Sequence, residues 1–137
     1  MWLNQFTVTG NTFRLESFQF YMRTEFAFTN TVSLAVLDAN GQTLVSGVLN
    51  LELAASGAWY TITLNNPLTF NDGQSFSIQT GASGIIGYPA GADANARVPN
   101  RSFFFDRSQN RYVSLGTIPG FGNGAFLIRA VGTLIPT

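Results

Sequence analysis

The sequence predicts an all-β fold, a jelly-roll-like sandwich of two antiparallel sheets. Apolar and polar residues alternate with a period of two along most of the chain, which places every second side chain of a strand in a core. Turn-forming residues recur roughly every 8 to 12 positions, as they do between sandwich strands. No stretch shows sustained helical periodicity. The 137 residues are the length of a single ordinary domain, residues 1–137.

The amino-terminal strands extend to about residue 22. Within the second of them, the apolar positions change parity between Leu15 and Phe18. A slip of one residue turns a strand over unless a bulge absorbs the extra residue. We therefore expect a β-bulge near Glu16 and Ser17.

Two sequences predict the hairpin turns of the middle region. Asp38-Ala39-Asn40-Gly41 follows the strand that contains Leu34 and Val36, and Asn71-Asp72-Gly73-Gln74 precedes the strand that contains Phe76 and Ile78. Asn-Gly supplies the positive φ angles that tight hairpins need, and Asp-Gly is an equally strong turn signal.

The last third reads as strand, polar turn and strand over residues 101–115, with the turn at Arg107 to Asn110, and a closing strand follows at 125–133. Two irregular stretches, 81–100 and 116–124, contain most of the Gly and Pro of this region. A loop as long as the first is uncommon in a compact domain and is often functional.

The inward positions of these strands should form the core. The expected core residues are Phe6, Val8, Leu15, Phe18, Phe20, Leu34, Val36, Tyr60, Ile62, Leu64, Phe76, Ile78, Phe126 and Ile128.

The composition limits the classes of partner. Hydrophobic residues make up 45% of the chain and charged residues only 10%, against about 25% in typical soluble proteins. The net charge is zero, so no overall field attracts nucleic acid or an anionic membrane. No run of 18 apolar residues predicts a transmembrane helix. The chain opens directly on strand-like sequence without a signal peptide, and we expect a domain excised from a larger secreted protein that extends upstream.

Missing residue types exclude most catalytic sites. The chain has no His, Cys or Lys, which removes Ser-His-Asp and Cys-His nucleophiles, cysteine or histidine zinc sites and Schiff-base chemistry. The seven carboxylates are scattered or explained by turns, so we expect no enzyme activity. Asp93-Ala94-Asn95 or Asp38-Ala39-Asn40 could each contribute two ligands to a structural calcium, although the turn interpretation is favoured. No other cofactor is expected.

A cationic and aromatic cluster is the candidate binding site. Four of the seven Arg fall within fifteen residues, and aromatic residues lie in or beside the same loops. Aromatic faces stack on sugar rings, and Arg donates forked hydrogen bonds to hydroxyl or carboxylate groups. We expect Tyr88 and Tyr112 to be the stacking platforms and Arg97, Arg101 and Arg111 to orient the ligand. The alternative is a solubilised hairpin whose Arg residues pair with Asp93 and Asp106.

Several pieces in order resemble the lectin-like jelly-roll modules appended to secreted bacterial peptidases of the papain-like and subtilisin-like kinds. The pieces are Trp2–Thr7 (WLNQFT), Leu15–Tyr21 (LESFQFY), Val32–Asp38, Leu44–Gly47 (LVSG), Trp59–Leu64 (WYTITL) with Pro67, Asp72–Ile78 (DGQSFSI), Arg101–Phe105 (RSFFF) and Gly124–Ala130 (GAFLIRA). The resemblance implies an extracellular or cell-surface accessory module that binds a glycan or a cell-surface protein.

A structural or assembly domain that self-associates through sheet edges is the alternative function. Low charge and many apolar residues fit such a role. The peptidase modules often begin with an acidic, glycine-rich strand ahead of the position of Trp2, and this chain lacks it. A missing strand would leave an open edge that another chain could fill.

Overall fold

The computed structural model describes residues 1–22, 28–53, 57–82, 92–93, 101–120, 122 and 124–136. Apart from one short 3-10 helix, η1 (Leu115–Thr117), the regular elements of these residues are strands, so the all-β prediction is confirmed. The strands are β1 (Trp2–Thr7), β2 (Thr12–Met22), β3 (Phe28–Asp38), β4 (Thr43–Leu53), β5 (Ala58–Phe70), β6 (Ser75–Ala82), β7 (Ala92–Asp93), β8 (Ser102–Asp106), β9 (Arg111–Ser114), β10 (Ala125–Phe126) and β11 (Ile128–Ile135).

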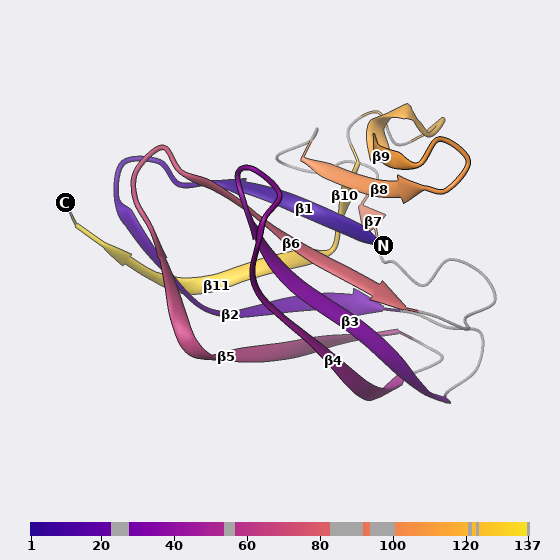
Figure 1. Cartoon of the computed structure of the whole chain (residues 1–137), viewed down its shortest axis with the longest axis horizontal. Helices are drawn as coiled ribbons and strands as arrows, with labels where there is room; N and C mark the ends of the chain where they lie inside the picture. Colours follow the sequence, from indigo (N-terminus) through magenta and orange to yellow (C-terminus); the bar gives the residue numbers. More distant parts are fainter. Residues whose placement is uncertain are drawn as a thin grey trace.

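The strands form two main antiparallel sheets that pack as a sandwich (Figure 1). The large sheet has the order β4-β3-β6-β1-β8-β9, and the small sheet has the order β11-β2-β5. A two-stranded ribbon, β10-β7, accompanies them. Figure 1 shows the β8–β9 hairpin at one end of the molecule, close to the N-terminus. The sandwich of two antiparallel sheets is therefore as expected, while the jelly-roll order of connections stays a prediction.

The core lies between the two sheets and follows the predicted alternation. Phe6, Tyr60, Ile62 and Leu64 are partly buried against it, and the other predicted core residues are buried. Sequence reasoning missed further buried members of this cluster, namely Trp2, Met22, Val32, Phe70 and Leu115. Phe76 is the centre of an aromatic group, with Phe70 stacked on it at a centroid distance of 4.3 Å.

The predicted bulge in β2 is confirmed. Against β11, Leu15 and Ser17 lie opposite the adjacent residues Gly132 and Val131, so Glu16 is the extra residue of β2. Against β5 the irregularity is larger and lies in the other strand. The four residues 64–67 of β5 stand opposite Glu16 alone, so β5 contains the extra residues there. The bulge lets both halves of β2 direct apolar side chains into the same core although their parity differs.

The predicted hairpin turns are present, but their φ angles differ from the expectation at one position. Gly41 and Gly73 have φ of +79° and +84°. Asn40 does not share the positive φ with Gly41, since Asn110 is the positive-φ residue among the described non-glycine residues. The β3–β4 connection is thus a three-residue loop ending in a left-handed Gly41, and the ladder shifts at its base. In the β8–β9 turn Asn110 takes the left-handed position, with φ of +52°.

A buried polar network fastens the end of the chain to the large sheet. The side-chain amide of Asn4 donates to the carbonyl oxygens of Phe126 (2.8 Å) and Ile128 (3.3 Å). The Ser102 hydroxyl donates to Asn4 Oδ1 and accepts from the Phe126 amide at 2.9 Å. Asn4 and Ser102 are both buried. Since each polar group of the network has a partner, the burial of these side chains is compensated.

Candidate functional site

Three of the five predicted site residues fall within the described residues. These are Arg101, Arg111 and Tyr112. Tyr88 and Arg97 lie outside the described residues, as does most of the 81–100 loop. The site is therefore built from the β8–β9 hairpin and the strands beside it.

Tyr112 stands on the outer face of the large sheet. It lies opposite Phe105 in the β8–β9 ladder, and the two rings meet edge to face at a centroid distance of 5.4 Å. The Tyr112 hydroxyl donates a hydrogen bond to Gln79 Oε1 on β6, and Gln79 Nε2 lies 3.2 Å from Met1 Sδ. Partial burial raises the pKa of the Tyr112 phenol. The side chain keeps 37% of its surface exposed, so its ring remains accessible to a ligand.

Arg101 lies on the same outer face, at the other end of β8. Its Nη1 donates to Thr7 Oγ1 at 3.1 Å, and that hydroxyl is 2.8 Å from Ser75 Oγ. The Gln5 amide donates to the Arg101 carbonyl oxygen at 2.7 Å, which fixes the backbone beside β1. Arg101 and Phe105 are four positions apart along the extended chain, or about 13 Å. Arg101 and Tyr112 thus mark two ends of one surface.

Uncharged polar side chains cover part of the face between these two ends, and Leu3 and Phe103 add apolar side chains to it. In the β1–β6 ladder Gln5 lies opposite Ser77 and Thr7 opposite Ser75, and their inward neighbours belong to the core. The next strand, β3, adds the small residues Ser33 and Ala35 on the same face. We call this surface the outer strip: Gln5, Thr7, Ser75, Ser77, Gln79, Arg101, Phe103, Phe105 and Tyr112. In the outer strip, the polar side chains come mainly from β1 and β6, and the aromatic side chains come from β8 and β9.

Arg111 does not join this surface, contrary to the prediction. It neighbours Tyr112 in β9, so strand alternation points it to the opposite side. Its Nε donates to Gln109 Oε1 at 2.8 Å. Closeness in the sequence does not place Arg111 and Tyr112 on one face, because adjacent strand residues point to opposite sides.

The alternative pairing of the hairpin arginines with Asp106 is not seen in the described residues. The Asp106 carboxylate instead accepts hydrogen bonds from the Ser108 amide and hydroxyl and from the Gln109 side chain. The hydrogen bond from the Ser108 side chain is the main cause of the lowered pKa of Asp106. Asp106 therefore shapes the β8–β9 turn.

A second aromatic and cationic cluster, which sequence reasoning missed, lies on the outer face of the small sheet. The Arg129 guanidinium carbon sits 3.9 Å above the Trp59 ring, and Tyr21 meets Trp59 edge to face. Gln19 Nε2 donates to Thr61 Oγ1 at 3.1 Å in the adjacent row. The alternation of β2 and β5 contained this signal, since these residues occupy the outward positions. Because Arg129 already covers one face of Trp59, that ring is a poorer stacking platform than Tyr112.

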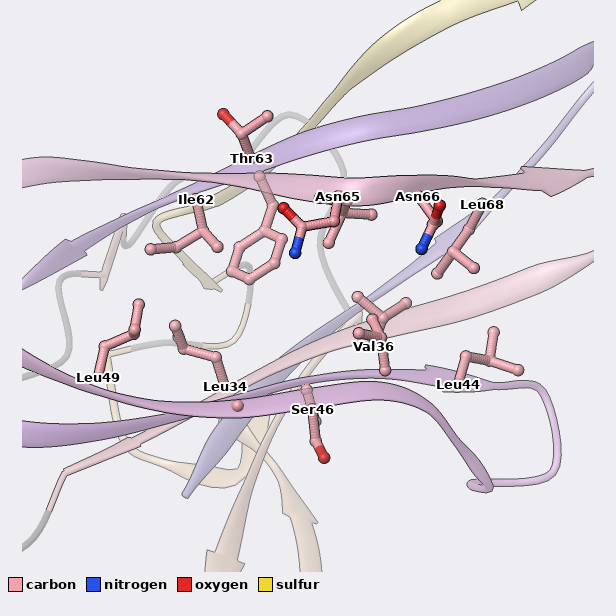
Figure 2. Close-up of a pocket in the computed structure, with 15 residues that line it drawn as sticks. Leu34, Val36, Leu44, Ser46, Leu49, Ile62, Thr63, Asn65, Asn66 and Leu68 are labelled. Carbon is pink, nitrogen blue, oxygen red and sulfur yellow. The ribbon is translucent and has the colours of Figure 1, made fainter.

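An apolar groove of about 380 Å³ runs between β4 and β5, at the side where the two sheets end. Figure 2 shows Leu34, Leu44 and Leu49 from the large sheet directed toward Ile62 and Leu68 on β5. Asn65 and Asn66 on β5 add polar side chains to its lining. The sequence showed these residues only as members of strands, because the groove depends on how the two sheets are offset.

Of the two calcium candidates, the structure describes the side chain of Asp38 but not that of Asp93. The Asp38 carboxylate accepts from the amides of Asn40 and Gln42, each at 2.9 Å, as a turn residue does. The Asp93 side chain lies outside the described residues. Within the described part of the chain, no three Asp or Glu side chains gather as metal ligands would, and no helix is long and apolar enough to cross a membrane.

No protein-family model matches the chain, and no curated protein or solved structure matches it. The resemblance to modules of secreted peptidases therefore stays a hypothesis.

Proposed function

We propose that this domain is a non-catalytic extracellular module that binds carbohydrate through the outer strip. The observation that carries the proposal is the position of Tyr112 and Arg101 at two ends of one sheet face, where hydroxyl and amide side chains lie beside Leu3 and Phe103. The resemblance to accessory modules of secreted peptidases supports a place outside the cell, beside a catalytic domain.

The chemistry of the outer strip suits a sugar chain. Sugar rings have apolar C–H faces that pack on aromatic rings, and Tyr112 offers a partly exposed ring at one end of the outer strip. Sugar hydroxyls both donate and accept hydrogen bonds. The side chains of Gln5, Gln79 and Ser77 can do the same, and Arg101 adds donors. An extended ligand would contact Tyr112 and Arg101 through different sugar units.

Four carboxylates of the described residues support a non-catalytic role. Asp38, Asp72 and Asp106 accept hydrogen bonds from turn or loop amides, with Gly10 N to Asp72 Oδ1 at 2.7 Å. Glu16 interacts with the Thr133 hydroxyl and lies 3.5 Å from the Arg14 guanidinium. Carboxylates with structural partners are poorly placed to act as the acid and base of a glycosidase.

A glycan array probed with the purified domain tests the proposal. The wild-type protein should bind at least one class of glycan, and Tyr112→Ala and Arg101→Ala should each weaken that binding about tenfold or more, a loss of roughly 1.4 kcal/mol. Tyr112→Phe removes the hydroxyl but keeps the aromatic ring, so this variant should retain most of the binding. Arg129→Ala removes an exposed arginine from the other sheet and should change nothing.

Failure of the wild-type protein to bind any glycan at millimolar concentration would remove the carbohydrate proposal. Loss of binding in Arg129→Ala but not in Tyr112→Ala would move the site to the small sheet. Binding to cell-surface protein rather than glycan would keep the module extracellular and change its ligand.

A further inference from the structure

Strand β4 is an exposed edge that lacks the usual protection against pairing with another strand. It is the terminal strand of the large sheet and spans eleven residues. Leu44, Val45, Val48 and Leu49 are exposed by 43%, 39%, 65% and 40%. Edge strands of soluble proteins are normally short or carry Lys, Pro or inward-pointing charges. In β4 the only charged residue is Glu52, and Pro is absent.

The inward face of β4 is also incomplete. Val45, Gly47 and Leu49 lie opposite buried residues of β3, so they face the small sheet. Gly47 contributes no side chain there, and a Cβ added to it would meet no atom within 4 Å. The gap is part of the groove between β4 and β5, which is lined by Leu34 and Ile62 (Figure 2).

We propose that β4 pairs antiparallel with β4 of a second copy of this chain, about a two-fold axis at Val48. Each Val48 then lies directly opposite the partner's Val48. In this register Gly47 faces the partner's Leu49, which sits on the inward side and fills the gap that Gly47 leaves. Directly opposed residues of an antiparallel pair share a face, so Val45 also meets the partner's Leu51 on the inward side.

Charge and polarity fit a second copy of the same chain. On the outward side, Ser46 faces the partner's Asn50, which pairs polar groups. The two Glu52 carboxylates lie near opposite ends of the paired strands, about 27 Å apart, so they do not repel strongly. The matches of apolar with apolar and polar with polar residues about Val48 run from Val45 to Leu51 of one strand, and an unrelated strand would have to reproduce them by chance.

The size of the surface is also adequate for a dimer. Eleven residues give an edge of about 36 Å, and the two layers of the sandwich make it about 20 Å wide. The resulting footprint, on the order of 700 Å², is close to the roughly 800 Å² per partner of a standard stable interface. The inference is independent of glycan binding, because the outer strip is centred on β1, β6, β8 and β9.

Sedimentation velocity over a range of protein concentrations tests the proposal. The wild-type chain should form dimers in the micromolar range. Val48→Lys and Val48→Glu, each measured alone, should weaken dimerisation at least tenfold, because each places like charges directly opposite one another. An equimolar mixture of the two variants should recover dimers as a Lys–Glu heterodimer. Val131→Lys, at a residue 41% exposed on edge strand β11, is the matched control and should dimerise like the wild type.

Three results would overturn the proposal. A wild-type chain that stays monomeric at several hundred micromolar excludes the dimer. Dimers that Val48→Lys leaves intact assign the interface to another surface. A mixture of the two charged variants that stays monomeric excludes the register centred on Val48. Circular dichroism of each variant distinguishes a lost interface from a lost fold, and glycan binding per protomer should be the same in all of them.

Discussion

Replacing Asn4 with alanine measures how strongly the buried network holds the closing strands to the large sheet. The substitution removes two hydrogen bonds that the Asn4 amide donates, at 2.8 Å and 3.3 Å, and the bond that its oxygen accepts from Ser102. Each lost bond costs about 1 kcal/mol, and the cavity left by the amide adds about 1 kcal/mol more. The expected loss is therefore about 4 kcal/mol, a large fraction of the 5 to 15 kcal/mol that typically stabilises a domain.

Urea unfolding followed by tryptophan fluorescence gives this value directly, provided that the slope of the transition stays unchanged. Thr80→Val is the matched control in the same sheet. The Thr80 hydroxyl is fully buried and has no hydrogen-bond partner among the described residues, so valine should be neutral or stabilise the fold by about 1 kcal/mol. A decrease in the free energy of unfolding below 1 kcal/mol in Asn4→Ala would refute the conclusion that the network holds β10 and β11 to the large sheet. An equal decrease in Thr80→Val would refute it as well.

Three further measurements test local features. Gly132→Ala should destabilise the domain by about 3 kcal/mol in urea unfolding, because its Cβ would lie 1.9 Å from a backbone carbonyl oxygen of β2, while Gly47→Ala should cost nothing. Because the pKa of Asp106 is lowered in the folded state, its ionised carboxylate stabilises the β8–β9 turn at pH values above the ordinary carboxyl pKa. This stabilisation is lost as the pH falls through the lowered pKa. Carboxyl NMR titration should show Ser108→Ala moving this pKa back toward normal, and an unchanged pKa would exclude the Ser108 hydrogen bond as the cause. An ultraviolet titration of the wild type, compared with that of Tyr112→Phe, should show that the Tyr112 phenol ionises above pH 10. The stability of the folded state should fall as the pH rises through the ordinary phenol pKa.

The core and the bulge were predictable because they depend on local alternation. The parity change between Leu15 and Phe18 was visible in the sequence, and the register against β11 confirms Glu16 as the extra residue. Asn4 was not recognised, although its parity places it on the same inward side as Trp2. Its partners lie about a hundred residues away in the sequence, and no local pattern identifies them.

The candidate site was predictable only in part. Arg101 and Tyr112 were chosen for their chemistry, but the face they share is created by the pairing of β8 with β1, which joins residues far apart in the chain. Arg111 lies on the other side from Tyr112, since neighbouring strand residues point to opposite sides. Gly47 shows the remaining limit. A glycine within a strand suggests a bulge or a close approach, and only the register shows that here it opens a groove.

NMR titration of the isotope-labelled domain tests the central claim most directly, because it locates a ligand residue by residue. The probes are chitotetraose, cellotetraose and mannotetraose, each added to millimolar concentration. We predict amide shifts that saturate and that cluster on the outer strip, at Gln5, Ser77, Gln79, Arg101 and Tyr112. Shifts centred on Trp59 and Arg129 or on β4, or no shift with a sugar that the array identifies as bound, would contradict the account.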